Sequence, residues 1–305
     1  HDGSTALYIA SQNGHLEVVH LLLSKSEIDI NTADEEDGST ALMSASKAGH
    51  VEVVRLLLSK SEIDINKPND VGVTPLMMAS LNGHTKVVEL LLLSEHGLDI
   101  NKSVTGKQGG HTALIFASDE GHVEVVRLLL SHSEINVNKT TYDGCTAIYM
   151  ATQSNHPTVV RLLSSTGRTD INKVGDNGWA PIHHASVSNL VKVIEILIEN
   201  NELRINKITN EGRTALNMAA QKGHVEVVRL LISTSEIDIN KARDDGCTAL
   251  LYASNGGHVE VVRLLLSKSE IDINQAMNDG VTALYIASDR GHLEVVRLLL
   301  SKSEI

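Results

Sequence analysis

Apolar residues recur along the chain in two short blocks, and this arrangement repeats about every 34 residues. In the first block, Leu follows a glycine by four residues and Ala follows it by seven, so both lie on one face of a helix. The second block, Val-Glu-Val-Val-Arg-Leu-Leu-Leu in residues 51–58, is apolar except for a Glu and an Arg three positions apart. The pattern therefore predicts pairs of short helices, with a charged stripe on the second.

Nine such helix pairs fit the chain. The glycine that opens each pair is followed two residues later by Thr, or once by Ala, and it occurs at Gly3, Gly38, Gly72, Gly110, Gly144, Gly178, Gly212, Gly246 and Gly280. Regular self-similarity at this period is typical of solenoid proteins. We predict an all-α repeat solenoid that forms a single array over residues 1–305. Its repeats begin near residues 1, 36, 70, 108, 142, 176, 210, 244 and 278.

Each end of the first helix has a recognisable signal. The Thr lies where an N-cap hydroxyl would accept a hydrogen bond from a free backbone N–H. A second glycine, eleven residues after the first, is replaced in two repeats by Asn155 and Asn189. Gly and Asn are the residues that tolerate a left-handed C-terminal cap, so the first helix is expected to end there.

The complete repeat resembles the ankyrin repeat family. A representative unit reads G-x-T-A-L-x-x-A-S-x-x-G-H-V-E-V-V-R-L-L-L-S-K-S-E-I-D-I-N, and residues 178–183 (G-W-A-P-I-H) also carry the family's His after the apolar residue. The loop S-E-I-D-I-N is one residue longer than is usual in the family. The resemblance implies helix–turn–helix units with projecting β-hairpin loops, and a concave face formed by hairpins and first helices. It also implies that the Asn closing each D-I-N segment bonds the loop backbone.

Composition narrows the function. The net charge of −12 disfavours binding to nucleic acid or to anionic membranes, which requires clustered cations. The sequence contains no stretch of 18 apolar residues that would predict membrane insertion. Cys145 and Cys247, three repeats apart, are expected to be free surface thiols, which favours an intracellular, cytoplasmic location. A protein partner of basic or mixed charge fits the acidic balance.

No motif indicates catalysis, a cofactor or a metal site. Eight histidines follow the second glycine, one in each of eight repeats, so successive side chains are about 10 Å apart and do not converge on one ion. We interpret them as hydrogen-bonded turn residues. The chain is therefore not expected to be an enzyme.

The repeats differ from one another mainly beside the hairpin glycine and along the first helix, and all the aromatic residues lie in these variable positions. Aromatic side chains are enriched at binding hot spots. We predict a partner-binding patch with acidic residues at its edge, formed by Phe116, Tyr142, Tyr149, Trp179, His183, His184, Asp119 and Glu120. For Phe116 and Tyr149, packing between repeats is an equal alternative.

The favoured function is a non-catalytic protein–protein interaction module. The alternatives are a structural or elastic spacer within a larger protein, or a parasite or viral effector that binds host proteins in the host cytoplasm. The last helix is as apolar as the internal ones. This predicts either that the segment was cut from a longer array or that its ends stack on one another through Val296 and Leu299.

Overall fold

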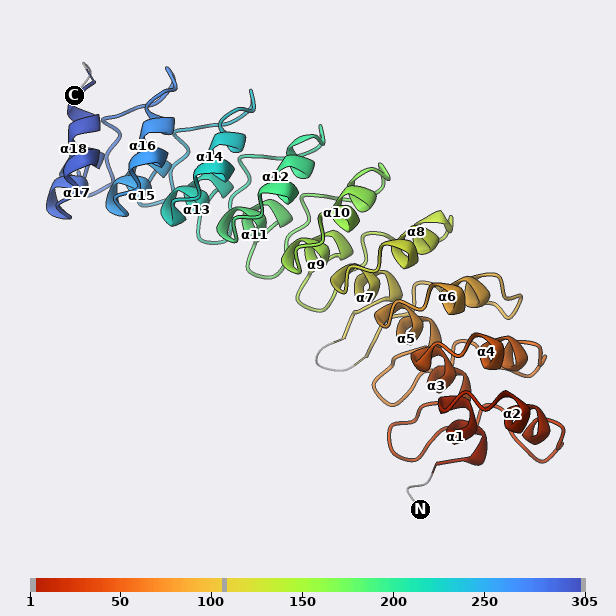
Figure 1. Ribbon diagram of the computed structural model, residues 1–305. Coiled ribbons are helices and arrows are strands. Elements are labelled where there is room, and N and C mark those ends of the chain that lie inside the picture. Colours follow the sequence, from red (N-terminus) through yellow and green to blue (C-terminus); the bar gives the residue numbers. More distant parts are fainter. Residues whose placement is uncertain (1–3, 106–108, 303–305) are drawn as a thin grey trace. The chain divides into compact units, whose positions relative to one another are not determined.

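The computed structural model describes residues 4–105 and 109–302. Gly3, part of the loop between residues 104 and 110, and Ile305 lie outside these ranges. The described residues form 18 helices and only isolated β-bridges (Figure 1), which confirms the predicted all-α repeat fold.

The chain divides into two compact units, His1–Thr169 and Asp170–Ile305, which we call the N-unit and the C-unit. The N-unit contains α1 (Ala6–Gln12), α2 (Leu16–Leu22), α3 (Ala41–Ala48), α4 (Val51–Leu58), α5 (Pro75–Leu81), α6 (Thr85–Leu92), α7 (Ala113–Asp119), α8 (Val123–Ser131), α9 (Ala147–Gln153) and α10 (Pro157–Ser164). The C-unit contains α11 (Pro181–Val187), α12 (Val191–Ile198), α13 (Ala215–Lys222), α14 (Val225–Leu231), α15 (Ala249–Asn255), α16 (Val259–Leu265), α17 (Ala283–Asp289) and α18 (Leu293–Leu300). That the nine repeats act as a single array stays a prediction.

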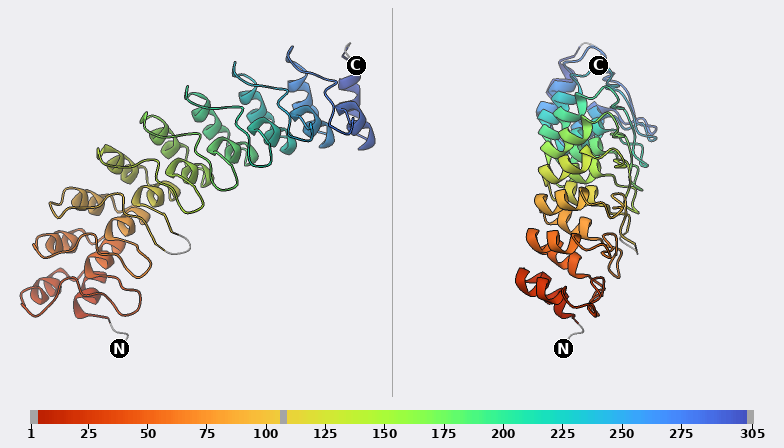
Figure 2. Two further views of the ribbon diagram at one scale, coloured as in Figure 1. Left: turned by 180° about the vertical axis from the view of Figure 1, so that it is seen from behind. Right: turned by 90° about the vertical axis from the view of Figure 1, so that its right-hand side faces the viewer.

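Within each unit the helices form two layers. The first helices pack side by side in the order α1, α3, α5, α7, α9 in the N-unit and α11, α13, α15, α17 in the C-unit. The second helices form the other layer. In each unit, the long loops that connect the repeats project beyond the helices on one side (Figure 2).

The ends of the first helices follow the sequence signals. Eight of these helices have a threonine N-cap whose side chain accepts a backbone hydrogen bond, as Thr40 does from the Met43 amide at 3.3 Å. At the other end, Gly49 has φ +77° and Asn189 has φ +57°, which is the left-handed conformation that the Gly/Asn pattern predicts.

The connecting loops are tight hairpins that bond one another. Isolated antiparallel bridges join Ala33 to Thr40 and Thr140 to Thr146. Successive hairpins are linked through the main chain, since the Asp70 amide donates to the Asp37 carbonyl at 3.1 Å. Bonds of this kind join successive hairpins in the N-unit, and in the C-unit they join Asn210 to Asn177 and Asn278 to Asp245.

Two side-chain series join each repeat to a neighbour. Asn66 donates to the Gly97 carbonyl at 2.8 Å and accepts from the Asp99 amide at 2.8 Å, so one amide group satisfies two backbone groups of the next repeat. The histidine that follows the turn glycine bonds backward, and His84 Nε2 lies 2.9 Å from the Lys47 carbonyl. The structural interpretation of the turn histidines and of the loop asparagines is thereby confirmed.

The core is thin and repeated. The Ala seven residues after the hairpin glycine is buried in all nine repeats, which allows the two helices of a pair to approach closely. Leu and Val from both helices fill the space around it, as Leu57 and Val54 do without any exposed surface. Burial of this kind supplies most of the stability of short helices, which are marginal in isolation.

Candidate functional site

The solvent face of the second helices carries an ion pair between residues three positions apart in seven repeats. A Glu and an Arg three residues apart form an ion pair of 2.9–3.5 Å in five repeats: Glu52–Arg55, Glu124–Arg127, Glu226–Arg229, Glu260–Arg263 and Glu294–Arg297. Two more repeats carry Lys86–Glu89 and Lys192–Glu195 with the charges reversed. Exposed pairs of this type contribute about 0.5 kcal/mol or less. This face is therefore uniform and offers no distinctive recognition surface.

The hairpins and first helices present a different set of side chains in each repeat. The residue after the hairpin glycine varies from Ser39 to Trp179 to Arg213, and the residue six after it varies from Ser44 to Phe116 to His184. The side chains of the hairpins and first helices therefore differ between repeats far more than those of the second helices.

In the N-unit, the predicted site residues divide by exposure. Tyr142 is 59% exposed, although its ring rests against the backbone of Gly109 in the preceding hairpin. Phe116 is half-buried and stacks on His111, with ring centroids 5.2 Å apart. Tyr149 is only 6% exposed, which agrees with the packing alternative for this residue.

The two acidic residues of the predicted patch lie at the end of α7. Asp119 is half-buried and accepts a 2.6 Å hydrogen bond from the Ser154 hydroxyl in the next repeat. Glu120 caps the helix and is exposed. The Asp119 carboxylate therefore helps to join two repeats, and Glu120 is the acidic residue that is accessible to a partner.

In the C-unit, Trp179 and His184 lie together. Trp179, beside the hairpin glycine, is half-buried, and its ring centroid is 6.4 Å from that of His184. Burial lowers the pKa of His184, so this ring favours its neutral form. The pair forms an aromatic surface where the hairpin meets α11.

His183, in contrast, lies inside the C-unit with no exposed surface. Its Nδ1 accepts a hydrogen bond from the Ala180 amide at 2.9 Å, and its Nε2 donates to the Lys207 carbonyl at 2.8 Å. Burial lowers the pKa of His183. It contributes to the predicted site only by supporting the segment that carries Trp179 and His184.

The sequence analysis missed a charged cluster in the C-unit. The Arg213 guanidinium lies 6.0 Å from the centre of the Tyr252 ring and pairs with Glu211 at 3.1 Å. In the next hairpin, Arg243 pairs with Asp245 at 3.2 Å. An arginine directly after a hairpin glycine, as at position 213, was the signal available in the sequence.

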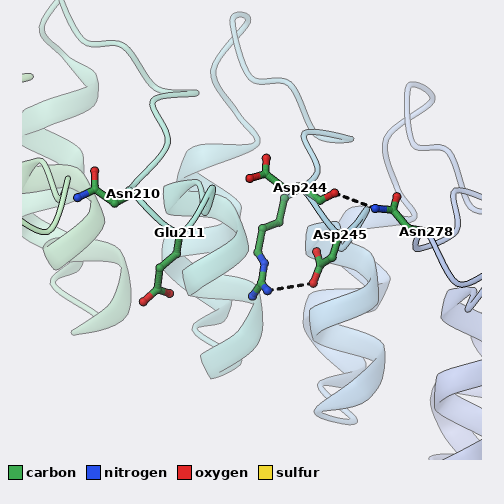
Figure 3. Close-up of a pocket in the computed structure, with 6 residues that line it drawn as sticks. Asn210, Glu211, Asp244, Asp245 and Asn278 are labelled. Carbon is green, nitrogen blue, oxygen red and sulfur yellow. Dashed lines mark hydrogen bonds and ion pairs between the residues drawn. The ribbon is translucent and has the colours of Figure 1, made fainter.

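This cluster borders an open hollow of about 510 Å³ that spans three hairpins (Figure 3). Its lining residues are Asn210, Glu211, Arg243, Asp244, Asp245 and Asn278. The hollow is open and lined by polar and charged residues; of these, Arg243 and Asp245 pair with each other, and Glu211 pairs with Arg213 outside the lining.

The expectation that both cysteines are surface thiols is wrong for Cys247. This residue is 8% exposed, and burial raises the pKa of its thiol to about 11. The buried thiol with its raised pKa is therefore poorly reactive. Cys145 is partly exposed, and the two cysteines are not joined by a disulfide.

Residues 4–105 and 109–302 hold no group of three or more His, Cys, Asp or Glu side chains placed to bind a metal ion. In the same part of the chain, no helix has the length and apolar character needed to cross a membrane.

Comparison with known proteins assigns the family. The family model described as ankyrin repeats (3 copies) matches residues 7–104, 102–174, 166–243 and 235–305. The chain belongs to the ankyrin repeat family. Among solved structures, the crystal structure of EF0377, an ankyrin repeat protein, is similar, with 26% identity and a TM-score of 0.58. That match covers 62% of this chain and 96% of EF0377. A search of curated proteins gave no match.

Ankyrin repeats generally act as protein–protein interaction modules and are typically not enzymes. The ankyrin fold accounts for the geometry described above, because its hairpins and first helices form the face whose side chains vary. The matching family gives the general role.

Proposed function

We propose that this chain is a non-catalytic protein-binding array whose partner contacts the hairpins and first helices. The observation that carries the proposal is the contrast between the two faces. Five second helices carry the same Glu–Arg pair, whereas the hairpins and first helices present Tyr142, Trp179 and Arg213 at related positions. A spacer has no use for such diversity, so binding is favoured over the structural alternative.

The accessible part of the predicted patch supplies the anchors. Tyr142, Phe116 and Glu120 are the candidates in the N-unit, and Trp179 and His184 are the candidates in the C-unit. Aromatic anchors in interfaces frequently contribute about 2 kcal/mol or more. We further propose an intracellular, cytoplasmic setting, where the thiols of Cys145 and Cys247 stay reduced.

Affinity capture with this chain, followed by mass spectrometry, tests the proposal. The wild-type protein should enrich a partner that the double variant Tyr142→Ala/Trp179→Ala loses. The matched control is Arg229→Ala, which removes one outer-face ion pair and should leave capture unchanged.

Calorimetry with the captured partner provides the quantitative test. Trp179→Ala should weaken its affinity about thirtyfold, at about 1.4 kcal/mol per tenfold. Equal binding by wild type and by both Tyr142 and Trp179 variants would exclude this patch. Absence of any partner, with the protein otherwise folded, would favour the spacer.

Self-association is a separate proposal. Of the two end residues predicted from the sequence, Leu299 has no exposed surface and does not fit that role, whereas Val296 is partly exposed. Leu293 and Leu300 are the exposed apolar residues of α18, each 58% exposed. If stacking occurs, Leu293→Lys/Leu300→Lys should abolish concentration-dependent sedimentation, whereas unchanged sedimentation of this variant would refute it.

A further inference from the structure

The first three repeats enclose a small hollow on their first-helix side. Six residues after the hairpin glycine, eight repeats carry a large side chain: Ile9, Met78, Phe116, Met150, His184, Met218, Tyr252 and Ile286. The second repeat carries Ser44 instead. Ser39, directly after the hairpin glycine, is also small. The missing volume leaves a hollow of about 260 Å³, large enough for the end of a long side chain.

The walls of the hollow come from three neighbouring helices. Helix α3, which carries Ser44, packs between α1 and α5. Tyr8 on α1 and Met78 on α5 line opposite sides, and Met43 on α3 lies below. The Ser39 hydroxyl is 3.2 Å from the Met43 sulfur. Thioether and aromatic surfaces of this type pack well against an unbranched hydrocarbon chain.

The hairpin end of the hollow is acidic. Asp37 is exposed and lines it, and one of its oxygens accepts a hydrogen bond from the Ser39 amide at 2.9 Å. Asp34 is buried and accepts from the Ser4 hydroxyl and the Glu36 amide, so it shapes the hairpin. Burial and the nearby carboxylates, of which that of Asp37 has the largest effect, raise the pKa of Tyr8. Negative potential therefore reaches the Tyr8 hydroxyl.

A buried polar atom points to a ligand at the same place. Ser44 is 5% exposed, lines the hollow, and its hydroxyl has no hydrogen-bond partner. It is near enough to the Tyr8 hydroxyl to lower the pKa of that tyrosine, but the two do not meet in hydrogen-bond geometry. Buried hydroxyls normally have a partner, so an incoming donor would satisfy Ser44.

The other end of the hollow has the opposite charge. Lys47, near the end of α3, lines it there and is exposed. A cation in the hollow is repelled by Lys47 and attracted by Asp37. A ligand with one charged end is therefore oriented with that end toward the hairpin.

We propose that this hollow binds a lysine or arginine side chain from an extended segment of the protein partner. The carbon stem lies against Met78 and Tyr8, and the cationic group reaches Asp37 and donates to the Ser44 and Tyr8 hydroxyls. This proposal rests on the protein-binding function proposed above, and it specifies the chemistry of one contact. It does not involve the aromatic patch.

Two small probes test the proposal without the partner. They are N-acetyl-lysine methylamide and N-acetyl-norleucine methylamide, which share the four-carbon stem and differ in the ammonium group. Binding to the full chain is followed by amide NMR shifts of residues around Ser44. The lysine probe should saturate with an affinity about fivefold tighter than that of the norleucine probe, as expected for one partly exposed charge pair.

Three variants locate the contact. Ser44→Met introduces the residue that Met78, Met150 and Met218 provide at this position, so it should fold and should abolish binding of the lysine probe. Asp37→Asn keeps the oxygen that accepts from the Ser39 amide and should remove most of the preference for lysine. Arg55→Ala, on the outer face of the same repeat, should bind both probes as wild type does.

Each other outcome overturns the proposal. Three results would show that the hollow does not bind a basic side chain: the lysine probe causes no NMR shifts, it binds no more tightly than the norleucine probe, or it binds the Ser44→Met variant as tightly as wild type. Affinity capture by the wild-type chain is scored separately. Its success together with a negative probe experiment would reject this contact and retain the proposed function.

Discussion

The Nδ1 atom of His183 accepts a hydrogen bond from the Ala180 amide at 2.9 Å, in the one repeat whose first helix has no threonine cap. The usual threonine accepts from the amide three residues later, so here the bond runs in the opposite direction. Because Nδ1 accepts and Nε2 faces the Lys207 carbonyl, the proton of the neutral ring is on Nε2. One buried histidine thus substitutes for a cap and joins two repeats.

We expect His183→Leu to lower the free energy of unfolding by about 2–3 kcal/mol, because the Ala180 N–H and the Lys207 carbonyl lose their partner. Urea denaturation of the full chain, followed by far-UV circular dichroism, measures this change. Adding Ala180→Thr should recover about 1 kcal/mol by restoring the threonine cap. If His183→Leu leaves the free energy of unfolding unchanged, these two hydrogen bonds contribute little to stability.

The low pKa of His183 makes stability depend on pH. The folded state keeps the ring neutral, whereas the unfolded chain binds the proton with a pKa near 6.5. The contribution is therefore complete above pH 6.5 and is lost as the pH falls from there toward the lower pKa of the folded state. Denaturation at pH 7.5, 6.5 and 5.5 should show a smaller acid destabilisation for His183→Gln than for wild type. Identical pH dependences would contradict this.

The residue that directly follows the buried alanine of each first helix allows a second test, of the cost of burying an unpaired hydroxyl. Ser80, Ser118 and Ser254 are fully buried there, and their hydroxyls have no hydrogen-bond partner. In the seventh repeat the equivalent residue is Ala220, also fully buried. Ser80→Ala should therefore raise the free energy of unfolding by up to about 1 kcal/mol, as measured by urea denaturation. The reverse change, Ala220→Ser, should lower it, and a stabilising effect of that change would refute the argument.

Two turn glycines with the same φ separate backbone strain from side-chain contact. Gly83 and Gly291 both have φ +70°, but a Cβ at Gly83 would lie 2.7 Å from the His122 ring, whereas at Gly291 it would meet nothing. Gly291→Ala should cost about 1 kcal/mol of unfolding free energy from the left-handed backbone alone. Gly83→Ala should cost clearly more, because the His122 ring must move. If the two variants lose the same unfolding free energy in denaturant titrations, the His122 ring moves aside at no energetic cost.

Local signals were sufficient to predict the repeat and the ends of its first helix. Thr40 and Asn189 have the cap geometry expected of them because capping depends on a few adjacent residues. The turn histidines were also correctly interpreted, since their even spacing excluded a shared ligand. These features depend on interactions between residues that are close in the sequence, so they can be predicted from the sequence alone.

Exposure of the variable side chains could not be predicted in the same way. Tyr149 and Tyr285 occupy the same position of their repeats, yet Tyr149 is 6% exposed and Tyr285 is 63% exposed. The same position is buried in the second to eighth repeats, from Met43 to Leu251, whereas Tyr285 lies on α17, which packs against only one other first helix, α15, in the described part of the chain. The hollow beside Ser44 depends on the particular residues that vary between repeats, which the repeat pattern does not specify.

The amide of Asn206 bonds only to backbone atoms of the following repeat: it donates to the Glu236 carbonyl at 2.7 Å and accepts from the Asp238 amide. Every repeat presents the same backbone atoms at this place, so the bond does not distinguish one neighbour from another. Removal of residues 212–245 would leave Asn206 facing the carbonyl of Glu270 in the same register. Genetic duplication or loss of whole 34-residue blocks can therefore alter the order of surface side chains and still leave a partner for the two backbone groups that each such asparagine bonds.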